Sequence, residues 1–295
     1  MRKKRGVDKK KLLAFGLAVV TIVVCLIVYL VGTAKEAAPE DSPLNVAFID
    51  VGQGDCELLR CEDTVVLIDG GEAENGVKVE RYLNQMGVSA IDCYILTHPH
   101  SDHIGAAPYL MGRFPVGAVM MTEFSELNIP TTKNYEDLLD AVAASQAEVL
   151  FVKGGENYNF GPLSLNVLAP LAETDDYNDM SVVVRAVYKN TSFLFTGDAS
   201  QEVEKQILEG SPQIVSDVLK VGHHGSGSAT GAAFLKAVSP EYAVISCGAD
   251  NPYGHPDART LEMLKKCGAE TCRTDTDGTV LFFGDGRRLH VRTER

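Results

Sequence analysis

From residue 44 onward, short apolar runs alternate with turns rich in glycine, proline and polar residues. Runs with a high content of β-branched residues predict strands, and the first three follow one another closely enough to predict an antiparallel meander. Two later segments, 77–87 and 134–145, place apolar residues at helical spacing. The strands of this first half are expected at 44–51, 55–61, 64–71, 91–98 and 148–152.

The second half of the chain repeats this scheme. Three strand-like runs come first, and helices then alternate with strands. The strands are expected at 163–170, 181–188, 191–198, 217–224, 242–248, 279–284 and 288–293, and the helices at 201–210, 231–238 and 257–267. Two such halves, with their sheets face to face and their helices outside, predict an α/β fold with the four-layer αββα order of a sandwich. We therefore expect one domain over residues 44–295 rather than two.

The N-terminal part of the chain has a different pattern. Residues 1–11 are basic, and 12–31 follow as 20 residues without a charge. An α-helix needs about 20 apolar residues to cross the ~30 Å hydrocarbon core of a bilayer, so we expect one N-terminal transmembrane helix at 12–32. Residues 1–11 should then stay in the cytoplasm, which puts the polar linker 33–43 and the domain 44–295 on the extracellular side of the cell membrane. The alternative is a signal peptide whose cleavage leaves a secreted protein.

The charge balance limits the partners. The chain has a formal net charge of −13; residues 1–11 contribute seven Lys or Arg and one Asp, a net +6, so the rest carries −19. So acidic a body has no general attraction for nucleic acid, whose phosphates are normally neutralised by Lys and Arg. Binding of a polyanion would need a local feature that overcomes this field, and bound divalent cations would do so.

Six cysteines lie outside the apolar segment. An extracellular location would permit disulfides, and Cys267 and Cys272 could bridge neighbouring elements. No C-x-x-C pair occurs, so a cysteine zinc site is not expected. The alternative for all six cysteines is a free, buried thiol.

The segment THPHSDH, 97–103, concentrates three of the seven histidines around a proline, directly after an expected strand. His98 and His100 are two apart and can both reach one metal ion, while Asp102 and His103 can reach a second. Neutral imidazole and carboxylate are ordinary ligands of Zn²⁺ and also suit Mn²⁺. The spacing therefore predicts a site for divalent metal ions rather than a polar surface turn.

Other expected strands also run into metal-binding side chains. FLFTGD ends at Asp198, LKVGHH ends at His223 and His224, and ISCGADNPYGHP leads to His255. Strand-end loops of layered α/β proteins are a common place for active sites. Asp198 can bridge two cations because it offers two oxygens, and two metals ~3.5–4 Å apart would hold an attacking hydroxide between them. We slightly prefer His223 over His224 as the metal ligand, which leaves the other histidine to hydrogen-bond the substrate.

These motifs resemble a known family. THPHSDHIG, FTGD and HHGS resemble the metallo-β-lactamase superfamily, whose signature is H-x-H-x-D-H followed by later Asp and His ligands. IDVGQGDCELL, NDMSVVVR, FLFTGD, LKVGHHGS, VISCGADNPYGHP and RTDTDGTV look like the metallo-β-lactamase domain of ComEC-type competence proteins, in the family's order across residues 45–283. The resemblance implies the metallo-β-lactamase αββα sandwich, a dinuclear centre and a role near DNA at the cell surface.

The sequence departs from these families in two places. No histidine occurs between His103 and His223, where the wider superfamily places a metal ligand; the corresponding stretch is NDMS, 178–181, as in the ComEC-type pattern. Asn178, Asp179 or water would then complete the shell of the first metal, and fewer imidazoles make Mn²⁺ as acceptable as Zn²⁺. ComEC itself carries many transmembrane helices, whereas this chain has one candidate span and cannot form a DNA channel on its own.

The remaining motifs predict contacts around the metals. In DVGQGD, Gly52 and Gly54 would let the backbone approach closely, and Asp50, Gln53 and Asp55 could hydrogen-bond the ligands from behind; the alternative is a tight hairpin. His255 could bind a phosphate oxygen or protonate a leaving group. The other predicted contacts to ligands or substrate are Asn178, Ser181, Lys220, His224 and Ser226, of which Lys220 would offset the acidic body.

Together these observations predict an extracellular, membrane-anchored metal-dependent hydrolase. We expect a phosphodiesterase or nuclease that acts on single-stranded or double-stranded DNA, with Asp102 and His255 as catalytic residues and a DNA-uptake channel as a partner. The alternatives are a hydrolase of a small ester, lactone or other non-nucleic-acid substrate, which the acidic body favours, and a non-catalytic module of a DNA-uptake machine.

Overall fold

The computed structural model describes residues 42–210 and 213–295. The expected cytoplasmic segment 1–11, the expected anchor 12–32 and nearly all of the linker lie outside the described residues, so they stay predictions. Within the two described ranges, no helix is both long enough and apolar enough to cross a membrane.

The first half of the domain and the C-terminal hairpin build one sheet with the order β15-β14-β1-β2-β3-β4-β5-β6. Neighbours are antiparallel from β15 to β3 and parallel from β3 to β6, which confirms a meander followed by crossover connections. The strands are β1 (Leu44–Phe48), β2 (Cys56–Cys61), β3 (Thr64–Asp69), β4 (Ile91–Ile95), β5 (Val116–Met121), β6 (Glu148–Phe151), β14 (Val280–Gly284) and β15 (Leu289–Thr293).

The second sheet has the order β13-β12-β11-β10-β9-β8-β7. It repeats the same plan, since β7 to β10 pair antiparallel and β10 to β13 pair parallel. Its strands are β7 (Asn157–Phe160), β8 (Leu163–Ala169), β9 (Val183–Tyr188), β10 (Thr191–Phe195), β11 (Val218–Lys220), β12 (Tyr242–Ile245) and β13 (Glu270–Arg273).

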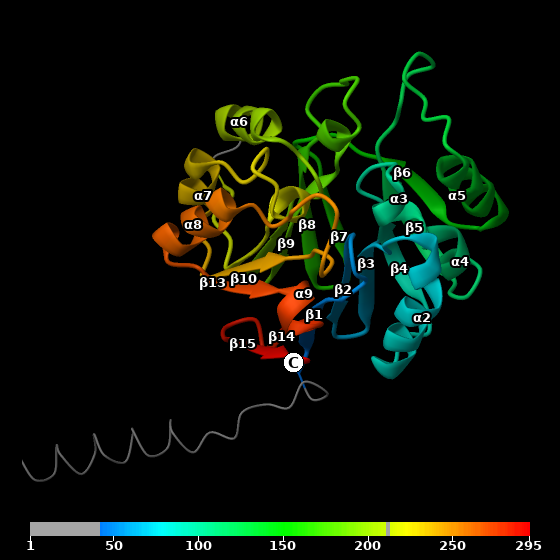
Figure 1. Ribbon diagram of the computed structural model, residues 1–295. Coiled ribbons are helices and arrows are strands. Elements are labelled where there is room, and N and C mark those ends of the chain that lie inside the picture. The colour runs from blue at the N-terminus through cyan, green and yellow to red at the C-terminus, as the bar shows by residue number, and fades with distance from the viewer. Residues whose placement is uncertain (1–41, 211–212) are drawn as a thin grey trace, which may run out of the picture. The chain divides into compact units, whose positions relative to one another are not determined.

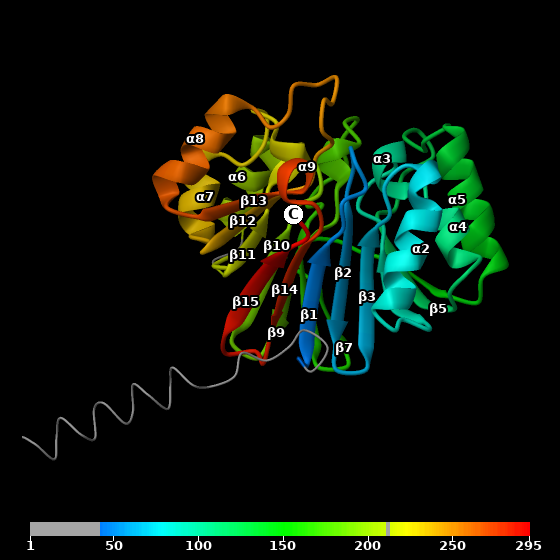
Figure 2. The same ribbon diagram turned by 60° about the horizontal axis from the view of Figure 1, so that its bottom comes forward.

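Helices cover the outer face of each sheet. Figures 1 and 2 show α2, α4 and α5 on one side of the molecule and α6, α7 and α8 on the other, with the two sheets between them. The helices and 3₁₀ turns are η2 (Ala73–Asn75), α2 (Gly76–Gln85), α3 (Ser101–Ile104), α4 (Ala107–Met111), α5 (Lys133–Ala144), η3 (Asn178–Met180), α6 (Gln201–Gly210), η4 (Gly222–Gly225), α7 (Ala232–Val238), α8 (Ala258–Cys267) and α9 (Thr274–Asp277). The predicted four-layer αββα order is therefore confirmed.

Strands that are covered on both faces explain the nearly continuous apolar runs of the sequence. In β1, Val46 and Phe48 belong to the core between the sheets, while Ala47 packs in the core under the first helical layer. Phe48 stacks on Phe195 of the second sheet at a centroid distance of 5.8 Å. Burial of one such phenyl ring contributes about 1.5–3 kcal/mol, so this contact helps to hold the two sheets together.

Several expectations differ from the structure. The strand predicted at 217–224 ends at Lys220, because the backbone turns into η4 at Gly222 and brings two histidines into a tight turn. All six cysteines of the described ranges are free, and Cys267 is exposed rather than buried. The possible Cys267–Cys272 bridge is therefore not formed.

Candidate metal centre

The metal-binding side chains follow strands whose carboxyl ends meet at one edge of the two sheets. His98 lies three residues after β4, Asp198 three residues after β10, and His223 three residues after β11. His100 directly precedes the short helix α3, which starts after the His-Pro-His turn, and His103 lies within this helix. The sequence therefore brings ligands from both halves of the domain to one point.

Asp198 is the centre of this group. Its carboxylate is buried and lies 3.8 Å from His98 Nε2, 3.4 Å from His103 Nε2 and 3.5 Å from His224 Nε2. His223 Nε2 lies 3.6 Å from the same carboxylate. Imidazole nitrogens lie close to both oxygens of this carboxylate, as expected for a ligand that is shared between two cations.

Several of these atoms are buried without a hydrogen-bond partner. Within the described residues, His103 Nε2, His224 Nε2 and Asp198 Oδ1 all lack one. Ligand atoms of Asp55, His103, Asp198 and His224 all lie within 4.8 Å of one another. Unpaired buried polar atoms are costly unless something binds them, and a divalent cation among them would satisfy all of them. The residues present therefore fit a metal site.

A second group of nitrogens that could bind a metal ion lies beside Asp198. His98 Nε2 and His100 Nδ1 face each other at 3.1 Å, in the manner of two nitrogens that can share one cation. The other side of the His98 ring is held by Thr97 Oγ1 at 3.1 Å and by Ser181 Oγ at 3.4 Å from Nδ1. Ser181 also accepts a hydrogen bond from the Asp198 backbone N–H, so this predicted residue ties two ligands together.

Hydrogen bonds at Nδ1 fix the tautomers of His103 and His224. His103 Nδ1 donates to Asp69 Oδ2 at 2.7 Å, and His224 Nδ1 donates to the carbonyl oxygen of Ser246 at 2.9 Å. Both rings therefore present an unencumbered Nε2 to the centre, as outer hydrogen bonds commonly arrange in metal sites. Asp69 was missed in the sequence, although it ends the apolar strand β3 in the same way that Asp198 follows β10.

A cluster of buried charged residues lies next to the metal-binding histidines. Lys220 Nζ pairs with Asp55 Oδ2, whose other oxygen lies 3.3 Å from His224 Nδ1. Glu57 is buried beside them, where burial and then the charge of Asp55 raise its pKa well above the ordinary value. Burial lowers the pKa of Lys220, but Asp55 and Glu57 outweigh it and raise the pKa. Lys220 is 1% exposed, so it acts on the ligands through Asp55 and does not contact substrate.

The two adjacent histidines occupy a strained turn. His223 has φ 49° and His224 has φ 53°, in the left-handed region that non-glycine residues rarely adopt. This backbone lets both imidazoles face Asp198, with His224 buried and His223 partly exposed. Only His224 also reaches Asp102, at 3.2 Å between Nε2 and Oδ2. The geometry therefore favours His224 as the ligand, against the slight preference for His223 drawn from the sequence.

The DVGQGD loop supports the metal motif by close backbone packing. A side chain at Gly54, whose φ is 130°, would collide with the backbone carbonyl of Asp102. The adjacent Asp55 N–H donates to that carbonyl at 3.1 Å. Asp50 does not reach the ligands and instead accepts hydrogen bonds from Gly52 N–H and from Arg295. Gln53 Oε1 accepts from Gly248 N–H and lines the open cleft over the metals.

This cleft has a volume of about 440 Å³. His100, Asp102, Asn178 and His255 line it, and no Lys or Arg is among its lining residues in the described part of the chain. Asn178 Oδ1 is buried without a partner and is free to join a metal shell, whereas Asp179 accepts from Ser200 N–H. Ser226 bonds to Ser228 and does not line the cleft.

Without metals, protons balance the carboxylates of the centre. Burial lowers the pKa of His224, but Asp198, Asp55 and Asp102 outweigh it and raise this pKa to about 10. Asp198 remains ionised because His224 and His103 lower its pKa well below the ordinary range, against the effect of burial. A metal ion that binds here must displace these protons, so metal binding weakens as the pH falls.

Comparison with known proteins assigns the family. The sequence pattern described as the metallo-beta-lactamase superfamily matches residues 49–249, which is more than half of the chain. The chain belongs to this superfamily. Its two halves, its strand-end histidines and its H-x-H-x-D-H segment are thus those of a metallo-hydrolase fold.

Relatives of this superfamily member include competence proteins. It is 32% identical to ComE operon protein 3 of Bacillus subtilis over 257 residues, which are 81% of this chain and 33% of that protein. It is 32% identical to competence protein ComA of Neisseria gonorrhoeae over 281 residues, 94% of this chain and 37% of that protein. The predicted resemblance to ComEC-type domains is confirmed, and the chain spans about a third of the length of these relatives.

More distant similarity extends to an RNA-cleaving enzyme. The chain is 24% identical to endoribonuclease ysh1 of Aspergillus fumigatus over 208 residues, 60% of this chain and 23% of that protein. Among solved structures, CmlA, a diiron beta-hydroxylase from Streptomyces venezuelae, superposes with a TM-score of 0.58 at 17% identity, covering 84% of this chain and 55% of that one. This likeness shows the shared fold.

Proposed function

We propose that this protein is a membrane-anchored extracellular phosphodiesterase that cleaves DNA with the help of two divalent metal ions, Zn²⁺ or Mn²⁺. The observation that carries the proposal is the buried Asp198 carboxylate, whose Oδ1 lies close to His103 Nε2 and whose Oδ2 lies close to the Nε2 atoms of His98 and His224. This centre opens into a cleft of about 440 Å³.

The side chains divide between two ion positions. His98 and His100 would hold one ion, Asp102, His103 and His224 the other, and Asp198 would contribute an oxygen to each. When bound, the ions supply Lewis-acid activation of water and neutralise charge on the phosphoryl oxygens. Lys220 keeps Asp55 ionised and in place behind His224, and Asp69 keeps the His103 ring oriented.

His255 supplies the polar contact on the far wall of the cleft. Its ring centroid lies 5.9 Å from that of His223, and its backbone is held by Asn251, which accepts from His255 N–H at 3.0 Å. Burial, followed by the charges of His223 and His224, lowers the pKa of His255. A neutral imidazole at this point can donate a hydrogen bond to a phosphoryl oxygen, and the approach of the anionic substrate raises its proton affinity toward that of an acid.

The choice of nucleic acid as substrate is supported by the relatives. One is named as a competence protein and another as ComE operon protein 3, and a more distant one is named as an endoribonuclease. The membrane anchor rests on the uncharged run 12–31, and the extracellular side rests on the basic residues before it. We also propose a DNA-uptake channel as a partner, because the chain is similar to about a third of the length of these relatives.

The test is cleavage of labelled single-stranded and duplex DNA by the full-length protein in detergent, with Mn²⁺ or Zn²⁺. We expect cleavage that needs metal and is abolished by Asp102→Ala, while circular dichroism shows an intact fold. The control is Asp137→Ala on the exposed helix α5, which should retain activity. Failure of folded, metal-loaded protein to cleave any DNA under either ion would refute the proposal.

A second candidate is a hydrolase of a small ester or lactone. The observation that favours it is a catalytic cleft whose lining contains no Lys or Arg, on a body of charge −19. A panel of lactones and bis-p-nitrophenyl phosphate separates the two candidates, because the phosphodiesterase should hydrolyse only the latter.

The third possibility, a non-catalytic uptake module, predicts a protein that purifies without bound metal.

A further inference from the structure

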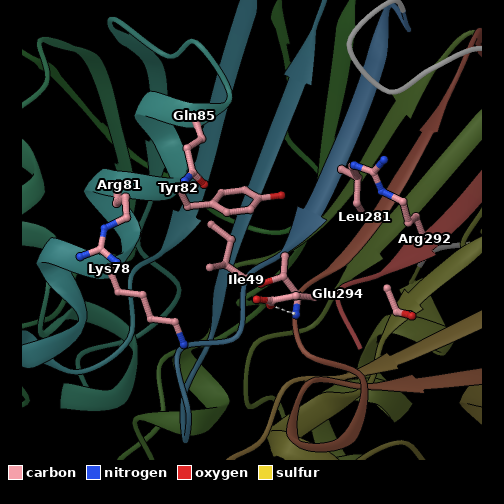
Figure 3. A pocket seen from close by; sticks show the side chains of 10 residues that line it. Ile49, Lys78, Arg81, Tyr82, Gln85, Leu281, Arg292 and Glu294 are labelled. Atoms are coloured by element: carbon pink, nitrogen blue, oxygen red, sulfur yellow. Dashed lines mark hydrogen bonds between the residues drawn. The ribbon is translucent and has the colours of Figure 1, made fainter.

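A second cleft, remote from the metals, is lined by cations. It has a volume of about 400 Å³ and lies between α2 and the C-terminal hairpin β14–β15. Figure 3 shows Lys78 and Arg81 projecting from α2 on one side, Arg292 from β15 on the other, and the ring of Tyr82 between them. Three cations and one carboxylate, Glu294, line it, in a domain that is otherwise strongly acidic.

Two of the three cations of this cleft have no acidic partner within the described residues, whereas Lys78 Nζ lies 3.8 Å from Asp50 Oδ2. Across residues 42–210 and 213–295, neither Arg81 nor Arg292 has a carboxylate oxygen within 4.0 Å. Glu80, the acidic neighbour on α2, faces the other way and accepts a hydrogen bond from Tyr109 at 2.7 Å. Glu294 accepts from the backbone N–H of Thr279 at 3.0 Å. The field inside the cleft is therefore positive.

Tyr82 adds an aromatic surface. Burial raises the pKa of Tyr82 to about 12, so its hydroxyl remains a hydrogen-bond donor at neutral pH. Ile49 and Leu281 form an apolar floor beside the ring. A basic groove with an aromatic platform is the combination that binds single-stranded nucleic acid, because phosphates meet cations while bases stack on the ring.

An intermediate cleft of about 590 Å³ shares lining residues with both this cleft and the cleft at the metal centre. Lys78 lines both the basic cleft and the intermediate one, and Gln53 lines both the intermediate one and the metal cleft. Carboxylates also line the intermediate cleft, but Asp50 is paired with Arg295 at 2.9 Å and Asp275 with Arg273. Glu72, Glu74 and Asp250 remain there, so phosphates should be held beyond this stretch rather than within it.

We propose that the cleft of Lys78, Arg81, Tyr82 and Arg292 binds the phosphodiester backbone of a single-stranded nucleic acid whose scissile phosphate lies at the metal centre. This inference rests on the proposed phosphodiesterase function. It supplies what the metal cleft lacks, because a long polyanion needs cations along its path and none line the metal cleft. The cleft would favour long substrates over dinucleotides.

The test compares two triple variants of the full-length protein in detergent. Lys78→Gln/Arg81→Gln/Arg292→Gln neutralises the cleft, and the matched control Lys205→Gln/Lys265→Gln/Lys266→Gln removes the same charge from α6 and α8 on the opposite helical layer. Binding of a labelled oligothymidine of about 30 nucleotides is measured by anisotropy without metal, over a range of salt concentrations. Hydrolysis of bis-p-nitrophenyl phosphate reports the metal centre separately.

We expect the cleft variant to bind the oligonucleotide about 10-fold more weakly or worse, and the slope of log K against log salt to fall by about 2, because each single-strand phosphate contact contributes about 0.7. The control should match wild type, and both variants should hydrolyse the small diester within about twofold of it. Unchanged affinity and slope in the cleft variant overturn the proposal, as does wild-type protein that binds no oligonucleotide.

Two further arms separate other outcomes. If wild-type protein binds a duplex with the same number of phosphates more strongly than the oligothymidine, the single-strand assignment is overturned. The same holds if the cleft variant loses binding to anionic phosphatidylglycerol vesicles but still binds the oligonucleotide as wild type does. Wild-type protein that binds the oligonucleotide through this cleft but hydrolyses neither DNA nor the small diester would support the cleft and refute the proposed catalytic function. The two failures are therefore distinguishable.

Discussion

Replacement of the buried Lys220 by methionine tests whether the charge cluster beneath the metal centre is organised as described. Lys220 is 1% exposed and its ammonium pairs with Asp55, which is also buried. Lys220→Met keeps most of the side-chain volume but leaves Asp55 without its cation and next to Glu57. Breaking a buried ion pair by removal of one partner costs about 3–5 kcal/mol, a large part of the roughly 5–15 kcal/mol that stabilises a typical domain.

The assay is urea unfolding of metal-free protein near neutral pH, followed by circular dichroism. We expect the free energy of unfolding to fall by about 3–5 kcal/mol in Lys220→Met. The matched control is Lys205→Met, whose lysine side chain is 65% exposed and pairs with Glu202 at 3.8 Å; it should change the free energy by less than about 1 kcal/mol.

The pH dependence provides a second, independent readout. In wild type, Lys220 and His224 lower the pKa of Asp55 against the effect of burial. Without Lys220, burial should raise that pKa above its unfolded value, so the variant regains stability as the pH falls and Asp55 takes up a proton. A loss below about 1 kcal/mol, or a loss that does not shrink on acidification, would contradict this account.

Three other substitutions test neighbouring parts of the account. Asp69→Asn should weaken metal binding about 10–100-fold in calorimetric titrations, because it removes the carboxylate that orients the His103 ring. The control is Asp92→Asn, which changes a carboxylate that accepts a hydrogen bond from Val65 N–H and should leave metal affinity unchanged. His224→Ala should reduce the metal content from two ions to one, and equal loss in His223→Ala would reopen the choice between them. Burial raises the pKa of Glu204 to about 7 against hydrogen bonds from two backbone N–H groups. Between about pH 4.5 and about pH 7 the unfolded chain releases this proton while the folded protein keeps it, so wild type should lose up to about 3 kcal/mol of stability relative to Glu204→Gln as the pH rises. Parallel stability curves for the two proteins would refute this shift.

The order of the four layers and most of the candidate metal ligands could be predicted from the sequence, because both follow from patterns that repeat along the chain. Strands covered on both faces read as continuous apolar runs, and polar residues directly after them stand out, as at His98 and Asp198. The short helices α3, α4 and α9 and the strands β5, β7 and β13 were not predicted. They are four to six residues long, which is too short for a hydrophobic period to show.

Other features of the site depend on three-dimensional contacts that no local pattern encodes. The roles of His223 and His224 differ through backbone angles at one turn. Lys220 reads as an exposed cation in sequence, yet it is enclosed because β11 lies inside the second sheet. Asp69 could have been found by applying the strand-end argument to β3, but one aspartate before two glycines also resembles an ordinary turn.

The most direct test of the central claim is an anomalous-scattering experiment on crystals of the protein loaded with Mn²⁺. The account predicts two peaks ~3.5–4 Å apart, one beside His98 and His100 and the other beside Asp102 and His224, with the Asp198 carboxylate reaching both. A single peak, or density for metal only at other places on the surface, would contradict it.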